Sequence, residues 1–133
     1  MSGIVDAVEA VQEIAAEVSP VPAKFEHVTS PADLKARLDW GEPALTIIDV
    51  RDRESYNDER IMGAISIPIE ELTTRAAQIL DMDRDVYVYS DSDQNTEGAA
   101  IQMYQAGFEH TAAIEGGLSA WKAAGGAVEG RNT

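Results

Sequence analysis

Two short apolar runs that are rich in β-branched residues constrain the fold of this 133-residue chain most strongly. Residues 45–50 read LTIIDV and residues 86–89 read VYVY. Runs of this length and composition are typical of strands that are covered on both faces of a sheet. Weaker strands are predicted at residues 25–28, 64–68 and 111–114.

Helix-like stretches separate these runs along the chain. Ser30 and Pro31 provide an N-cap and a first helical residue for a helix that runs to about Leu38. Further helices are predicted at residues 53–57, 69–80, 96–106 and 118–124. Strands that alternate with helices predict an α/β fold with three layers, in which helices flank a mainly parallel sheet of about five strands.

The N-terminal segment has a pattern of its own. Its apolar residues are spaced by three and four positions, which predicts an amphipathic helix over residues 1–19: Ile4, Val8, Val11, Ala15 and Val18. Pro20 and Pro22 favour extended backbone and predict a linker at residues 20–23. We therefore expect an N-terminal helix that packs on its own domain, a linker, and one α/β domain over residues 24–130.

Composition limits the functions that are open to the chain. It has 24 acidic and 10 basic residues, for a net charge of −14, and such a field repels nucleic acid and anionic lipid. We expect a cytoplasmic protein with a basic protein partner and no bound cofactor. The chain has no cysteine, which excludes disulfides, thiolate metal sites and a cysteine nucleophile.

Three ordered motifs resemble the rhodanese-like domain family. The sequence IDVR at residues 48–51 is followed by IMGAISIP at residues 61–68, and VYVY at residues 86–89 precedes a loop and a helix that ends at AGF. The third motif is EGGLSAW at residues 115–121. The family's motif positions in this chain are Asp49, Arg51, Gly63, Gly116, Gly117 and Trp121.

The resemblance implies a sulfurtransferase fold with an altered active-site loop. In this family a cysteine after the strand accepts a sulfane sulfur, within a cradle of backbone N–H groups and loop arginines. The corresponding residues here are Ser90, Asp91, Ser92, Asp93, Gln94, Asn95 and Thr96. Ser90 takes the cysteine's position, Asp91 and Asn95 take positions where basic residues are usual, and Asp93 replaces glycine.

These replacements predict a catalytically inactive module with a binding or regulatory role. A serine cannot form a persulfide, and its hydroxyl is a weak nucleophile unless a base activates it. Carboxylates near the loop oppose a bound anion. No catalytic residue is therefore expected, and Asp49, Arg51 and Trp121 are interpreted as structural, the first two at a strand end and the tryptophan in the core.

Two other uses of the loop remain open from the sequence. A hydrolase could use Ser90 on an ester or phosphate held in the cradle. Alternatively, Asp91, Asp93 and Glu97 could form a metal-responsive switch, because the alternating acids match the first half of a calcium loop. The match then fails at Thr96 and Gln102, so no specific metal site is predicted.

Overall fold

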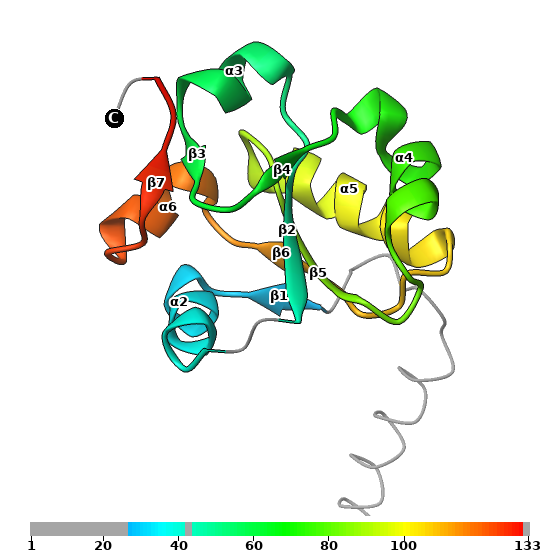
Figure 1. Ribbon diagram of the computed structural model, residues 1–133, viewed down its shortest axis with the longest axis horizontal. Coiled ribbons are helices and arrows are strands. Elements are labelled where there is room, and N and C mark those ends of the chain that lie inside the picture. Colours follow the sequence, from blue (N-terminus) through cyan, green and yellow to red (C-terminus); the bar gives the residue numbers. More distant parts are fainter. Residues whose placement is uncertain (1–26, 42–43, 132–133) are drawn as a thin grey trace, which may run out of the picture.

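The computed structural model describes residues 27–41 and 44–131 (Figure 1). The predicted N-terminal helix at residues 1–19 and the linker at residues 20–23 lie outside this range, as does the start of the predicted strand at residues 25–28. No helix within the described ranges is long and apolar enough to cross a membrane.

A five-stranded sheet forms the centre of the domain, and all of its strand pairs are parallel. The order across the sheet is β1 (Val28–Thr29), β6 (Thr111–Ile114), β5 (Asp85–Tyr89), β2 (Leu45–Asp49) and β4 (Ile65–Ser66). This confirms the predicted α/β class. A small antiparallel pair, β3 (Arg60–Ile61) with β7 (Val128–Glu129), was not predicted.

Helices cover both faces of the sheet, as the three-layer prediction requires (Figure 1). On one face lie α4 (Leu72–Ile79) and α5 (Asp93–Gln105), and on the other lie α2 (Pro31–Asp39) and α6 (Gly117–Ala123). The short helix α3 (Arg53–Asp58) follows β2, and the 3₁₀ turn η1 (Ile69–Glu71) precedes α4.

Local capping explains where two of these helices begin. Ser30 Oγ accepts a hydrogen bond from Asp33 N at 3.1 Å, so α2 starts as predicted. Helix α5 begins at Asp93, because Ser92 Oγ accepts from Asn95 N at 3.1 Å. The prediction that this helix starts at residue 96 is therefore wrong, because only residues 90–92 lie between β5 and α5.

Trp121 anchors the face of the sheet that α2 and α6 cover. Its side chain is 3% exposed, and its indole Nε1 donates to Ala127 O at 2.8 Å. Gly126 lies against the ring, where an added Cβ would be 2.0 Å from the ring atom Cε2. The buried neighbours in this cluster are Leu34, Ile47, Ile61, Ala64, Tyr89 and Ile114. The predicted core position of Trp121 is confirmed.

Candidate functional site

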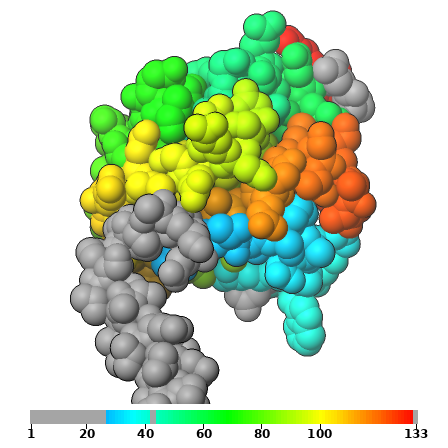
Figure 2. Space-filling model, turned by 180° about the vertical axis from the view of Figure 1, so that it is seen from behind, coloured from blue at the N-terminus to red at the C-terminus, as the bar shows by residue number. Residues whose placement is uncertain are grey.

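A cleft of about 500 Å³ opens where β2 and β5 end. Its wall is formed by residues that follow these strands, by η1 and by the first turns of α5. In the view from behind, the yellow-green start of α5 lies between the green and the orange segments (Figure 2). In open parallel sheets, ligands bind at the carboxyl ends of the strands, so this cleft is the candidate site.

Ser90 is the first residue after β5 and lines this cleft. It is 6% exposed; its backbone N donates to Thr96 Oγ1 at 2.8 Å, and its Oγ donates to Asp91 Oδ1 at 3.3 Å. The serine is thus held between the strand end and the first turn of α5.

The glycine pair of the third motif packs directly against this loop. Gly116 N donates to Asp93 Oδ1 at 2.8 Å. Gly117 has φ +64°, and a Cβ there would be 3.0 Å from Ser90 O. Both glycines lie in the left-handed region, which side chains rarely adopt. The structure therefore brings together two motifs that are far apart in the sequence.

Carboxylates give the cleft a negative charge. Asp52, Glu70 and Asp91 line it, and no Lys or Arg does so among the lining residues that the structure describes. A hydrogen bond from Asn95 Nδ2, at 3.1 Å, lowers the pKa of Asp91, and one from Ser55 N, at 2.8 Å, lowers the pKa of Asp52. Both groups are ionised at neutral pH, so the cleft disfavours a bound anion.

Asp49 and Arg51 form a buried ion pair beside the cleft. Asp49 is 0% exposed, and Arg51 donates to its two carboxylate oxygens, with Nη2 2.7 Å from Oδ2. Arg51 Nη2 also donates to Glu59 O at 2.6 Å, which ties the end of β2 to the residue before β3. Burial would lower the pKa of Arg51, but the hydrogen bond and charge of Asp49 raise it.

Tyr89 completes this network, and sequence reasoning missed it. Its hydroxyl donates to Asp49 Oδ2 at 2.7 Å and accepts from Ile61 N at 3.1 Å. Burial and the neighbouring carboxylate raise its pKa far above the ordinary value. A tyrosine at the end of a buried strand, level with an aspartate on the adjacent strand, was the available signal.

The acidic residues at the start of α5 do not form a metal-binding cluster within the described part of the chain. Within residues 27–41 and 44–131, no three or more His, Cys, Asp or Glu side chains gather to hold an ion. Asp91 accepts a hydrogen bond from Asn95, while Asp93 accepts one from Gly116.

Gly63, another motif position, lies in the turn between β3 and β4. It has φ +87°, and its N–H donates a hydrogen bond to Glu129.

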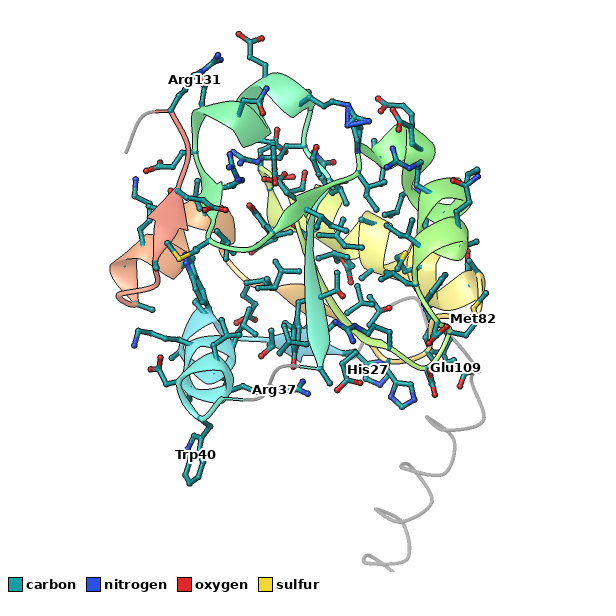
Figure 3. The ribbon with its side chains drawn as sticks, in the orientation of Figure 1. His27, Arg37, Trp40, Met82, Glu109 and Arg131 are labelled. Atoms are coloured by element: carbon teal, nitrogen blue, oxygen red, sulfur yellow. The ribbon has the colours of Figure 1, made fainter. Side chains whose placement is uncertain are left out.

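The two histidines lie away from Ser90. His27 and His110 line a separate pocket of about 230 Å³ with Asp85, the first residue of β5. His27 is labelled at the end of the domain where β1 begins (Figure 3). Because Ser90 follows the opposite end of β5, neither histidine is placed to act as its base.

A parallel sheet with helices on both faces, and a polar cleft at its carboxyl end beside a helix start, define a three-layer α/β domain with its candidate site at the strand ends. The chain belongs to the rhodanese-like domain family, since the family model described as Rhodanese-like domain matches residues 30–124.

Solved structures and curated relatives agree with this assignment. A crystal structure of the Alr3790 protein from Anabaena is 53% identical, has a TM-score of 0.75, and matches 77% of this chain and 91% of that one. Thiosulfate sulfurtransferase GlpE from Shewanella oneidensis is 33% identical over 78 residues, which are 59% of this chain and 76% of GlpE.

Other curated relatives are considerably longer than the matched region. The HTH-type transcriptional regulator Rv0324 from Mycobacterium tuberculosis is 37% identical over 81 residues, which are 61% of this chain and 34% of the regulator. The chain likewise spans 46% of YrkF from Bacillus subtilis. The family domain therefore occurs within larger proteins of different description.

Proposed function

We propose that this chain is a catalytically inactive rhodanese-like module that binds or regulates a basic protein partner in the cytoplasm. The observation that carries the proposal is Ser90 at the start of the loop, inside a cleft lined by carboxylates. A serine cannot carry a sulfane sulfur, and the cleft's charge opposes thiosulfate. The same charge favours a cationic partner and disfavours nucleic acid.

Hydrolytic use of Ser90 has less support than binding. Asp91 accepts the hydrogen bond of the Ser90 hydroxyl, and the lowered pKa of Asp91 makes it a weak base. Activation of a serine requires a stronger base that is itself held in position.

The first test concerns sulfur transfer. The chain is expected to form no thiocyanate from thiosulfate and cyanide above a heat-treated control. Ser90→Cys alone should remain at least about tenfold below the variant that also carries Asp91→Arg, Asp93→Gly and Asn95→Arg, because nearby carboxylates reduce the thiolate fraction and repel thiosulfate. Circular dichroism checks that each variant folds, since Asp93 bonds Gly116. Equal activity of the single and quadruple variants would contradict the electrostatic explanation.

The second test concerns binding, with hexalysine as a cationic probe followed by amide NMR shifts. Hexalysine should shift the amides of Asp91 and Asn95 saturably, whereas thiosulfate should not. Asp91→Asn should weaken hexalysine binding about threefold, because a partly screened charge pair contributes ~0.2–1 kcal/mol. Glu109→Gln removes the same charge next to His110, away from the cleft, and should leave the affinity unchanged.

The pH dependence of hexalysine binding follows from the lowered pKa values of Asp91 and Asp52. A carboxylate with a lowered pKa stays ionised in mild acid, so binding should persist at pH 5 and weaken only below the ordinary value of 3.8. Loss of binding between pH 7 and 5, or an equal effect of Glu109→Gln, would contradict the assignment of the cleft.

A further inference from the structure

One edge of β2 is open over its first three residues. β2 pairs with β5 along its whole length, from Leu45 to Asp49, but it pairs with β4 only at Ile48 and Asp49. Residues 45–47 therefore have no strand on that side within the described part of the chain. Such an edge presents unpaired peptide groups to any extended segment that approaches it.

The direction of the peptide groups follows from the bonds further along the strand. Val50 N donates to Tyr89 O of β5, whereas Asp49 O, on the other side, accepts from Ile67 N. Because peptide groups alternate along a strand, those of Leu45 and Ile47 point to the same side as that of Asp49. The register with β4 pairs the carbonyl of Ile47 with Ile65, so the Ile47 N–H is the group that faces the open edge. Arg84 Nη2 donates to Leu45 O at 2.9 Å, so a side chain occupies a position that a strand would otherwise take.

An apolar groove of about 380 Å³ lies along this open edge. Its apolar lining comes from α2, β2, β4 and the turn before β4: Leu38, Leu45, Ile47, Met62 and Ile65. Met62 is 52% exposed. Trp40 is 86% exposed, follows Leu38 by two residues, and projects from the end of α2 (Figure 3).

Arg84 is the cation among the residues that line this groove. It bonds two neutral oxygens, Leu45 O and Thr46 Oγ1, and forms no ion pair with a residue in the described part of the chain. Every other Lys and Arg in residues 27–41 and 44–131 pairs with a carboxylate: Lys35, Arg37, Arg51, Arg53, Arg60, Arg75, Lys122 and Arg131. The chain has a net charge of −14, yet the guanidinium of Arg84 is available for an ion pair. A carboxylate of another molecule would complement this charge.

We propose that this groove binds an extended segment of another protein, which adds as a strand beside residues 45–47 and places a carboxylate on Arg84. The segment's backbone accepts a hydrogen bond from Ile47 N–H, while alternate apolar side chains pack between Leu38 and Met62. This surface flanks the first half of β2, whereas the acidic cleft lies beyond its end. The inference therefore stands independently of the basic partner proposed for the cleft.

Selection from a displayed library of random heptapeptides on the full chain tests the proposal. Enriched peptides should carry Asp or Glu among alternating β-branched or aromatic residues. In NMR titrations, the most enriched peptide should shift the Ile47 amide and slow its hydrogen exchange at least about tenfold, as expected for a newly bonded strand amide. Shifts confined to Asp91 and Asn95, or no enrichment over an unrelated protein, would overturn the proposal.

Matched variants separate charge from shape. Met62→Glu should weaken the selected peptide about tenfold by repelling its carboxylate, whereas Met62→Gln should have little effect. Arg84→Gln should abolish the preference for a glutamate peptide over its glutamine counterpart, and Arg75→Gln, which alters an ion-paired arginine of α4, should preserve it. A preference that survives Arg84→Gln, or equal losses in the two Met62 variants, would refute the site.

The chain's own N-terminal segment is the competing occupant. If removal of residues 1–26 exposes an Ile47 amide that was protected before any peptide was added, that segment fills the groove. This result would overturn the proposal of a partner segment. Unchanged exchange after the removal would support it.

Discussion

Replacing Asp49 with alanine is expected to lower the free energy of unfolding by about 3–5 kcal/mol, because it leaves a buried guanidinium without its counter-ion. Asp49 is fully buried, and it accepts hydrogen bonds from both Arg51 and Tyr89. The substitution therefore leaves the Arg51 guanidinium without its counter-ion and the Tyr89 hydroxyl without its acceptor. Domains of this size are stable by about 5–15 kcal/mol, so the variant should be close to unfolding at moderate temperature.

Urea unfolding of purified variants measures this effect. Asp39→Ala removes the carboxylate of an exposed i,i+4 pair with Lys35 and should cost no more than about 0.5 kcal/mol. Arg51→Ala combined with Asp49→Ala should destabilise the domain by less than the sum of the single variants, since each single variant leaves an unpaired partner. A loss below about 1 kcal/mol for Asp49→Ala would show that the pair contributes little.

Trp121→Ala is the second substitution with a large expected effect. Its ring fills the space between α6, the sheet and Gly126, and its indole N–H bonds Ala127 O. Truncating a buried tryptophan costs about 3–5 kcal/mol, through lost apolar burial and the cavity that remains. α6 starts at Gly117, where an added Cβ would be 3.0 Å from Ser90 O. The change should therefore also increase the mobility of the loop at residues 90–92.

The chain's other tryptophan is a matched control for this substitution. Trp40 is 86% exposed, so Trp40→Ala should change the unfolding free energy by no more than about 0.5 kcal/mol. Amide NMR should show larger shifts at Ser90 and Gly117 in Trp121→Ala than in Trp40→Ala. If both variants lost the same stability, the interpretation of Trp121 as the anchor of this face would be wrong.

Both predictions assign a structural role to residues of the family motifs. Asp49, Arg51 and Trp121 hold the ends of β2 and α6, which form the frame around the loop. Such residues stabilise the fold whether or not a nucleophile is present. A chain with serine at position 90 can therefore retain the motif residues while its loop carries acidic side chains.

The local pattern of apolar and capping residues was sufficient to predict the central strands and the start of α2. The apolar runs at residues 45–50 and 86–89 became the central strands β2 and β5, because β-branched and aromatic residues favour strands that are buried on both faces. Ser30 capped its helix as its type predicts. The three motifs indicated the family, because their order and spacing are properties of the sequence itself.

Other features depend on contacts between distant segments, which no local window contains. The sequence predicted a helix that starts at residue 96, yet Ser92 caps α5 and Asp93 reaches Gly116, 23 residues further on. Tyr89 meets Asp49 across 40 residues. Arg84 reaches the edge of β2 only because β5 pairs with it. The sequence by itself indicated the strands of the five-stranded sheet, the helices that flank it and the lack of a thiol, because these depend on residue type and local spacing. It did not indicate the β3–β7 pair or the start of α5 at Asp93. Tertiary structure alone decided which polar groups meet, since burial and hydrogen bonding arise only once the strands have been placed side by side.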